Sequence, residues 1–455
     1  MVLKKEKQPE GSSIMVREED RISKLPNPLL HHILFFLPFK NIVCTCVLAK
    51  RWRFVWSSVP NIEIGHWCSP DATARKLYME TIHFMDFMDR LFRFRDMSNI
   101  GKFSLSCNKH CDEDRVHSWL SAVVRHNVVE FSLLSKDERD SSMIPLLLFT
   151  CETLTMLKIE MPIYVDVPTN VHLPKLKVLQ LINIRFTAGP LIEKLCSNCL
   201  VLEELEINNC TIEDIMEISI SSHTLKRMFI DVPLCHQIDI DAPSLEVFQH
   251  KGTLAEVYDL FSFPSLIDAN ISLSDINDWM NGDHNIATNL LGHLFNVKRL
   301  VAGSCFLGAL SCADDNAFGE LPSFHNLTCL EVVWSSPDPI GSALMRLLQI
   351  SLKLETLVFS HGIDARLCGE DNGWKLTTVP ECLLSHLRVL EFHQFCGDQR
   401  EIGAVKLFSE NAKVLQSLII YTSSALSRDL SSKLQVEEQL QMLPRASSNC
   451  KLTVQ

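Results

Sequence analysis

A short apolar template, L-x-x-L-x-L, recurs along this chain and constrains its fold more than any other feature. Eight copies match the template clearly, and five weaker copies begin at Ile100, Val128, Leu245, Leu266 and Val297. The thirteen copies start 20 to 33 residues apart, and a period of that length indicates an array of stacked supersecondary units. The clear copies are LTMLKI (154–159), LKVLQL (176–181), LEELEI (202–207), LKRMFI (225–230), LTCLEV (327–332), LETLVF (354–359), LRVLEF (387–392) and LQSLII (415–420).

Each copy predicts one short strand. Alternation along a strand sends two apolar residues of a copy to one side of the sheet, and the residue between them to the other side. The intervening residues return the chain, so successive strands are expected to lie parallel. One unit cannot cover its own apolar face, so stacked neighbours build a continuous core and the array curves with its sheet on the concave side. The predicted fold class is therefore α/β.

The array resembles the irregular leucine-rich repeats of plant proteins. Its best copy, LEELEINNCTI, places Cys210 where such repeats carry Asn or Cys. The resemblance is good over residues 154–230 and moderate over 240–310, where DWMNGDH (278–284) and SCADDNAFGE (311–320) are expected to be loops. It implies an irregular leucine-rich-repeat solenoid over residues 98–378.

A second apolar segment, LPNPLLHHILFFLPFK (25–40), precedes the array. Prolines bracket a run of apolar residues at helical spacing, which predicts one short helix. Phe35 and Phe36 lie off the centre of its apolar stripe, so this helix needs more than one apolar neighbour. The segments NIVCTCVLAK (41–50) and RWRFVW (51–56) predict two more short helices. A unit of about forty residues buries too little surface to be stable alone and usually needs a partner.

This N-terminal segment closely resembles the F-box of plant F-box proteins. The resemblance implies a three-helix F-box over residues 19–60 that docks onto the small Skp-type adaptor of a cullin-RING ubiquitin ligase, and through it onto a cullin. The alternative is that the candidate residues only pack the F-box and its junction with the array. The candidate adaptor contacts are Leu25, Pro26, Leu30, Ile33 and Leu34. The matching positions are Asp20, Arg21, Ile22, Leu25, Pro26, Leu29, Leu30, Ile33, Leu34, Leu37, Pro38, Lys40, Val47, Leu48, Lys50, Arg51, Trp52, Arg53 and Trp56.

The C-terminal region, residues 379–455, combines two repeat-like strands with VEEQLQMLPRASSNCKLTVQ. Through its LPRASSNC motif (443–450), followed by a last apolar strand, it resembles the FBD domain found at the C-terminus of many plant F-box and leucine-rich-repeat proteins. A terminal strand with polar neighbours would cap the open end of the solenoid.

The middle residue of each L-x-L is predicted to point to the concave face. Polar, acidic and scattered apolar side chains suit recognition of a protein surface, where a few anchors such as Phe229 would carry most of the binding energy. A plain solvated sheet is the alternative. Some plant F-box proteins with such repeats bind small molecules on a basic floor, whereas Lys158 is the only basic residue at these positions. The candidate target-binding residues are Lys158, Gln180, Glu206, Phe229, Gln249, Asn270, Glu331, Val358 and Glu391, and the remaining copies place Ser104, Ser132, Val301 and Ile419 there.

Composition argues against several classes of function. A net charge of −12 disfavours a dedicated nucleic-acid binder. No apolar run reaches the roughly 18 residues of a membrane span, and the N-terminus lacks the apolar core of a signal peptide. We therefore expect an intracellular protein, in the nucleus or the cytoplasm, with no membrane partner. Residues 1–18 are charged and rich in small residues, which predicts a mobile tail.

The cysteines are the main candidates for chemistry. CSNC (196–199) has the spacing of half a zinc site or of a redox pair, and CNKHC (107–111) adds a histidine. No second C-x-x-C completes a four-ligand site. The motifs GxGxxG, GxxxxGK[ST], HExxH and GxSxG are also absent from the sequence. We expect no catalytic residue, no metal and no cofactor, with a Cys–His pair formed by folding as the open alternative.

Together, these features predict the non-catalytic substrate-recognition subunit of an SCF-type ubiquitin ligase. The F-box would hold the adaptor and the cullin, and the repeats would hold an unknown protein target near the E2 enzyme, so that proximity accelerates transfer. A leucine-rich-repeat scaffold that binds partners without ubiquitination is the alternative from another class, and a cysteine-dependent enzyme is a third.

Overall fold

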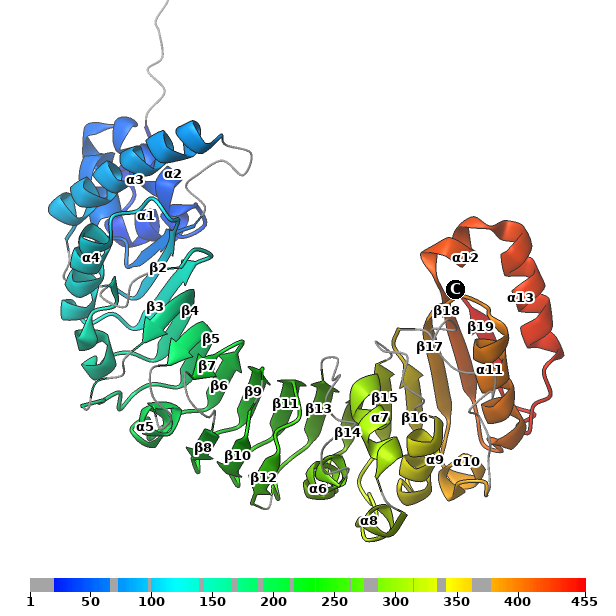
Figure 1. Ribbon diagram of the computed structural model, residues 1–455. Coiled ribbons are helices and arrows are strands. Elements are labelled where there is room, and N and C mark those ends of the chain that lie inside the picture. Colours follow the sequence, from blue (N-terminus) through cyan, green and yellow to red (C-terminus); the bar gives the residue numbers. More distant parts are fainter. Residues whose placement is uncertain are drawn as a thin grey trace, which may run out of the picture.

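The protein forms an open arc in the computed structural model (Figure 1), with helices at each end and one curved sheet between them. The predicted tail (1–18) and the predicted loop DWMNGDH lie outside the described residues. The structure describes residues 20–65, 73–96, 100–138, 143–165, 168, 170–186, 191–212, 217–233, 235–261, 263–273, 285–313, 315–333, 341–361 and 378–455.

A parallel sheet runs through the whole arc, and the predicted α/β architecture is confirmed. Each of the thirteen predicted copies forms one of its strands. Two further strands close the ends, namely β1 (Asn61–Ile64), which the template does not predict, and β19 (Lys451–Val454), the expected last strand. A short strand, β7 (Thr211–Ile212), pairs with β5. The thirteen strands are β2 (Lys102–Cys107), β3 (Glu130–Ser135), β4 (Met156–Val165), β5 (Val178–Phe186), β6 (Glu204–Asn208), β9 (Arg227–Val232), β11 (Val247–Gly252), β13 (Asp268–Leu273), β14 (Arg299–Gly303), β15 (Cys329–Val333), β16 (Thr356–Phe359), β17 (Val389–Phe395) and β18 (Ser417–Thr422).

The strands stack in a constant register. The middle residue of each L-x-L lies opposite the middle residue of the next copy, in one row that runs from Ser104 to Ile419. The residues on either side of the row point into the core, as Leu157 and Ile159 show by their nearly complete burial. A shift by one residue would expose every such leucine, so burial fixes the register.

The other side of the sheet is covered by helices near both ends and by a second sheet in the middle (Figure 1). The second sheet consists of β8 (Glu217–Ser221), β10 (Gln237–Asp241) and β12 (Val257–Leu260), all parallel. The copies that begin at residues 225, 245 and 266 have the shortest spacings, which leave room for an extended return but not for a helix. The helices are α3 (Ala74–Phe94), α4 (Glu113–Arg125), η5 (Leu146–Thr150), α5 (Leu191–Ser197), α6 (Ile286–His293), α7 (Ser304–Cys312), α8 (Asp315–Gly319), α9 (Gly341–Ile350), α10 (Glu381–Ser385) and α11 (Gln399–Asn411).

One predicted loop is wrong. The segment SCADDNAFGE ends α7 and then forms α8. Phe318 of α8 is buried, and the guanidinium of Arg346 lies 5.0 Å from its ring centroid. The polar sequence around this single aromatic residue gives a loop-like pattern, whereas packing of Phe318 holds the segment in place as a helix.

The N-terminal unit comprises η1 (Ile22–Lys24), α1 (Asn27–Leu34), α2 (Phe39–Cys44), η2 (Thr45–Val47) and η3 (Lys50–Ser58). The third predicted helix is therefore a 3-10 helix. Its apolar core is continuous with that of the repeat array. Backbone bonds reinforce the junction, because the amide of Asp96 donates to Ser57 (3.2 Å) and that of Gly101 donates to Pro60 (3.0 Å).

The C-terminal region adds α12 (Ser424–Arg428) and α13 (Leu430–Met442) before the motif LPRASSNC. The Ser447 hydroxyl of this motif donates to the carbonyl of Leu415 (2.7 Å), and the amide of Ala446 donates to the carbonyl of Ser409 (2.8 Å). These bonds fix the chain just before β19, which then pairs with β18 as the last strand of the sheet.

Candidate interaction surfaces

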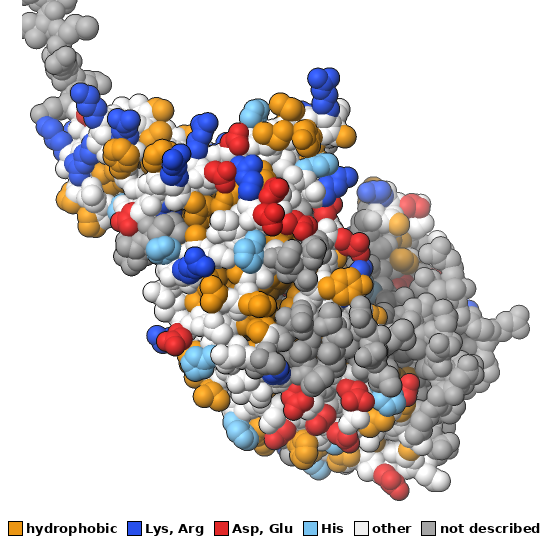
Figure 2. Space-filling view, turned by 60° about the vertical axis from the view of Figure 1, so that its left-hand side comes forward, with side chains coloured by type: hydrophobic (Ala, Val, Ile, Leu, Met, Phe, Trp, Pro, Cys, Tyr) orange, Lys and Arg blue, Asp and Glu red, His pale blue; other side chains and the backbone are white. Residues whose placement is uncertain are grey.

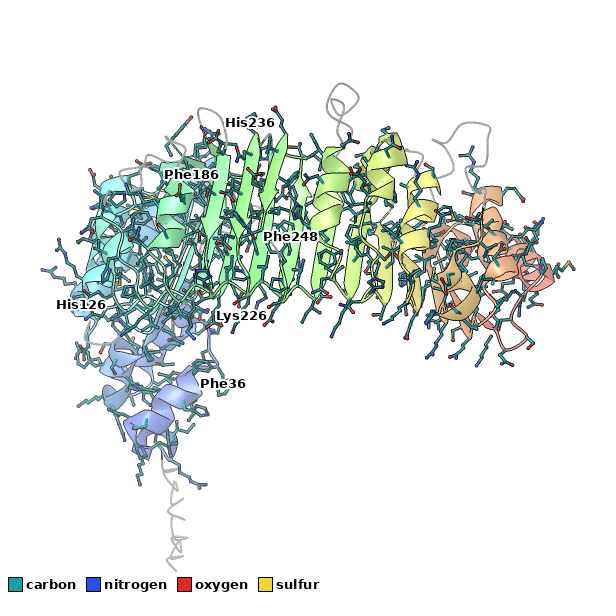
Figure 3. All side chains as sticks on the ribbon, turned by 90° about the horizontal axis from the view of Figure 1, so that it is seen from below. Phe36, His126, Phe186, Lys226, His236 and Phe248 are labelled. Atoms are coloured by element: carbon teal, nitrogen blue, oxygen red, sulfur yellow. The ribbon has the colours of Figure 1, made fainter. Side chains whose placement is uncertain are left out.

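The N-terminal unit leaves large apolar side chains in solvent. Leu29 and Ile33 lie one turn apart on α1, and Phe36 follows on the same side. Ile33 is 44% exposed and Phe36 is 72% exposed, and Figure 3 shows Phe36 projecting from the unit. A unit of this size normally hides such residues, so they indicate a binding surface. Six of the exposed apolar residues of this unit, which we call the N-terminal apolar set, are Leu29, Ile33, Phe35, Phe36, Val47 and Leu48.

The structure divides the five predicted adaptor contacts into two groups. Pro26 and Ile33 are exposed, and Leu25 is half-buried. Leu30 and Leu34 are 0% and 1% exposed. These two side chains fill the core of the unit, so the structure gives them a packing role, and their contact with an adaptor stays a prediction.

The RWRFVW segment (51–56) fixes the conformation of the Leu25–Pro26 turn. The guanidinium of Arg51 donates to the carbonyls of Ser23 and Leu25, and the indole N–H of Trp52 donates to the Ser23 hydroxyl (2.8 Å). These bonds hold the chain that enters α1. They account for the Arg and Trp at these positions without any contact to a partner.

Several exposed residues of the apolar set escaped the sequence prediction, which favoured the centre of the helical stripe. The signal for them was present in Phe35 and Phe36, which lie off that centre. Basic side chains accompany the set, since residues 20–60 contain six lysines and arginines but one acid, Asp20. Figure 2 shows blue and orange side chains gathered together at this end of the molecule.

The concave face carries a different chemistry. The register places all nine candidate target-binding residues in its central row, and brings four of them around one hollow of about 280 Å³: Gln180, Glu206, Phe229 and Gln249. The other five lie along the same row but outside the hollow, namely Lys158, Asn270, Glu331, Val358 and Glu391.

Many of the charged side chains on this face contact one another. Lys158 pairs with Glu160 (2.9 Å), Arg299 pairs with Glu331 (2.5 Å), and Glu391 accepts from or pairs with His393 (3.2 Å). Bonds from Arg299 and Ser360 help to lower the pKa of the Glu331 carboxyl, although burial opposes them. Such mutual pairing removes charge from the outer part of the row.

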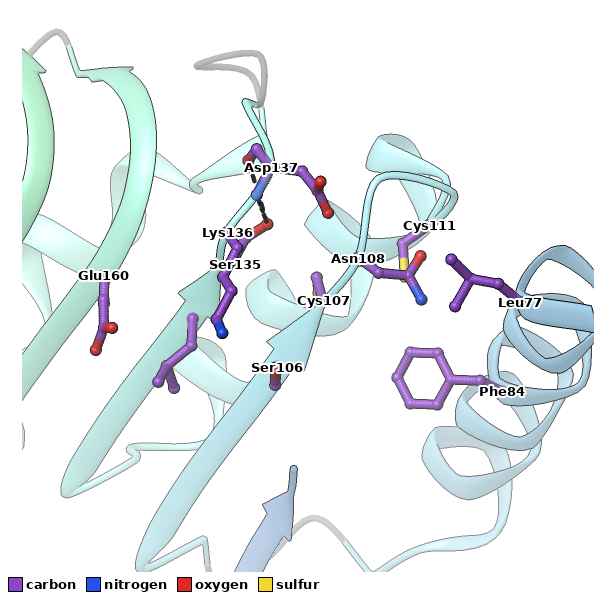
Figure 4. A pocket seen from close by; sticks show the side chains of 11 residues that line it. Leu77, Phe84, Ser106, Cys107, Asn108, Cys111, Ser135, Lys136, Asp137 and Glu160 are labelled. Carbon is purple, nitrogen blue, oxygen red and sulfur yellow. Dashed lines mark hydrogen bonds between the residues drawn. The ribbon is translucent and has the colours of Figure 1, made fainter. Parts of the chain in front are cut away.

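The cysteine motifs occupy the core. Cys196 and Cys199 are buried, and burial raises the pKa of both thiols, that of Cys199 to about 12. Thiols with such values are poor nucleophiles. Cys107 and Cys111 line a hollow of about 240 Å³ together with Asn108 (Figure 4), where Leu77 and Phe84 of α3 face them.

Among the residues that the structure describes, no group of three or more His, Cys, Asp or Glu side chains could hold a metal ion. Within the same ranges, every helix is too short or too polar to cross a bilayer.

Comparison with known families matches three parts of the chain. The F-box domain matches residues 22–63, the repeats described as "FBD-associated F-box protein At5g56370, LRR repeats" match 116–260, and the FBD matches 375–420. F-box/LRR-repeat protein At3g59210 of Arabidopsis thaliana is 32% identical over 96% of this chain and 94% of its own length. The chain belongs to the plant F-box/FBD/LRR-repeat family.

Other Arabidopsis thaliana relatives show the same full-length correspondence. Putative F-box protein At1g58310 is 31% identical over 96% of this chain and 95% of its own. Putative F-box/FBD/LRR-repeat protein At3g59240 is 30% identical over 95% of this chain and 88% of its own. The FBD match ends before the LPRASSNC motif, which the structure assigns to closing the sheet. This combination of F-box and repeats is that of a protein-interaction adaptor.

Proposed function

We propose that this chain is the substrate-recognition subunit of an SCF-type cullin-RING ubiquitin ligase. Its F-box binds a Skp-type adaptor, and through it a cullin, while its repeats bind a protein target. The chain supplies no reacting side chain. The observation that carries the proposal is the N-terminal apolar set. A unit of this size has few apolar residues for its own core, and it nevertheless exposes these six to solvent.

Burial of this set is large enough to drive association. Full burial of one large apolar side chain contributes about 1.5 to 3 kcal/mol. Six of them together can offset the roughly 4 to 15 kcal/mol that association costs. The basic residues around the set favour an adaptor surface with an apolar groove and an acidic rim.

The junction between the F-box and the repeats supports the second half of the proposal. The two parts share one core, and backbone bonds join Ser57 and Pro60 to the array. A target on the concave face is thereby held at a fixed distance from the adaptor. Proximity of target lysines to the E2 thioester is the catalytic contribution expected of such a subunit.

Target binding is proposed for the central row of the concave face. The nine candidates are all half-buried there, and four of them line a hollow that contains the aromatic anchor Phe229. The acidic balance of the chain favours a protein target over nucleic acid, and we expect the complex in the nucleus or the cytoplasm.

The decisive experiment is co-purification of the full chain with a Skp-type adaptor and cullin. The double variant Leu29→Asp with Ile33→Asp should lose both proteins, as should Leu25→Ala with Pro26→Ala to a smaller extent. Leu434→Asp is the matched control, because Leu434 is an equally accessible helical leucine at the other end of the arc. Retention of adaptor and cullin by the double variant at the wild-type level would refute the proposal.

Partner half-life distinguishes the ligase subunit from a repeat scaffold. A ligase target should accumulate when the gene is removed or the proteasome is inhibited. If the adaptor binds but no concave-face partner is stabilised by either treatment, the scaffold function is the correct one.

A further inference from the structure

The hollow on the concave face lies over β5, β6, β9 and β11, in the middle of the N-terminal half of the array. Its volume is about 280 Å³. Half-buried polar side chains surround one aromatic ring, so the hollow has both an apolar wall and fixed hydrogen-bonding groups. The side chains used in the argument are Gln180, Glu204, Glu206, Arg227, Phe229 and Gln249.

One negative charge in this hollow has no salt-bridge partner among the residues that the structure describes. Arg227 is paired with Glu204, so these two residues cancel. Glu206 receives only amide N–H groups, from Gln180 (2.9 Å) and Asn208 (3.3 Å), one on each carboxylate oxygen. Among the described residues, no lysine, arginine or histidine forms a salt bridge with it. The second lone pair of each oxygen remains available to a ligand.

The Phe229 ring lies beside this carboxylate. Glu206 and Phe229 are register partners on adjacent strands, which are about 4.8 Å apart in a sheet. The ring already attracts one cation, since the ammonium of Lys251 lies 5.4 Å from its centroid. Lys251 also faces the half-buried Asp231, whose carboxyl pKa burial raises and Lys251 lowers. A planar cation that reached Glu206 would therefore lie against an aromatic face.

Carboxylates without a salt-bridge partner also occur elsewhere on the concave strands from β1 to β18. Four cations of these strands are paired with carboxylates: Lys102 with Glu63 (2.9 Å), and Lys158, Arg227 and Arg299 with Glu160, Glu204 and Glu331. Within the described ranges Lys251 forms no salt bridge, but it lies over the Phe229 ring and faces Asp231. In contrast, Glu130 and Asp268 resemble Glu206, because neither forms a salt bridge within the described ranges. The face is thus complementary to positive charge.

We propose that this hollow binds an arginine side chain in a basic segment of the protein target. The inference rests on the proposed function only in that a protein target binds the concave face. Arginine fits better than lysine, because its planar fork can donate two bonds to Glu206 and stack on Phe229, while the Gln249 amide oxygen can accept a further N–H. Lysine would make only the point-charge contact.

The first test selects peptides from a random twelve-residue phage library on the purified full chain. Wild type should enrich arginine several-fold at one position, and Glu206→Gln should remove that enrichment. Glu130→Gln is the matched control, because it removes one unpaired acid from the same face outside the hollow. The proposal is overturned if wild type selects apolar or acidic peptides, if it selects none, or if both variants lose the arginine preference equally.

The second test measures affinity by fluorescence anisotropy with a selected peptide. Replacing its arginine by glutamine should weaken binding to wild type about tenfold, but binding to Glu206→Gln by less than about twofold. Equal losses for both chains would place the arginine elsewhere. Adaptor co-purification is measured separately, so its failure refutes the ligase role, whereas failure of the peptide cycle refutes the arginine site alone.

Discussion

The F-box and the concave face expose opposite kinds of side chain. The F-box leaves Ile33 and Phe36 in solvent, with basic residues around them, whereas the concave row exposes mostly polar groups, many of which bond to one another. Repeats cover each other's apolar sides, so their free face can be polar at no cost to the core. The forty-residue N-terminal unit has such a neighbour on one side only, where its core joins that of the array. Its surplus apolar surface is therefore informative about a partner, while polarity of the concave face is informative only through its unpaired charges.

The largest expected effect separates the two kinds of apolar residue on α1. Leu30→Ala should lower the free energy of unfolding by about 2 to 5 kcal/mol, because it leaves a cavity in the F-box core. Ile33→Ala should change it by less than about 0.5 kcal/mol and weaken adaptor binding instead. Chemical unfolding and adaptor binding, measured on both variants, give the comparison. Equal destabilisation by the two substitutions would show that Ile33 belongs to the core and not to an interface.

The contrast between Leu30 and Ile33 also marks where sequence reasoning was limited. In the strands, alternation decides the direction of every side chain, and the row through Lys158, Glu206 and Phe229 was predicted residue by residue. On α1, apolar residues occur nearly all round the helix. Such a pattern shows that the helix has several apolar neighbours, but it cannot show which side faces the chain's own core.

The second effect concerns a polar pair that the array hides. His250 of β11 is fully buried, and its Nε2 lies 2.7 Å from the hydroxyl of Tyr258 on β12. Burial lowers the pKa of His250 to about 4, against about 6.5 for a free imidazole. The unfolded chain therefore binds more protons between these values, and the free energy of unfolding should fall on the order of 3 kcal/mol as pH drops from about 6.5 to about 4.

The free energy of unfolding is measured against pH for wild type and for a variant, and the two curves are subtracted. The difference isolates the contribution of this histidine from that of carboxylates that titrate in a similar pH range. The difference between wild type and His250→Gln should change across that pH window. A pH-independent difference for His250→Gln would mean that the imidazole is not buried in its neutral form, and that the second sheet packs less closely on β11 than described.

The L-x-x-L-x-L template does not predict the second sheet. Copies define only the concave strands, and the return segments of this array follow no pattern of their own. The short spacing between the copies at 225, 245 and 266 excludes long helices, but pairing of β8, β10 and β12 with one another depends on contacts between segments about twenty residues apart. The only local signal for this pairing is the short length of the return segments between the copies.

The smallest effect tests the closed end of the sheet against the open surface of the F-box. Ser447 is 6% exposed, and its hydroxyl bond to Leu415 holds the chain before β19. Ser447→Ala should cost about 1 kcal/mol and accelerate hydrogen exchange of the β19 amides about fivefold, without affecting adaptor binding. Ser448→Ala, which alters an exposed neighbour, should leave exchange unchanged. If Ser447→Ala changes adaptor binding but not exchange, the motif serves a surface and not the sheet edge, and the two ends of the arc differ less than their exposed residues indicate.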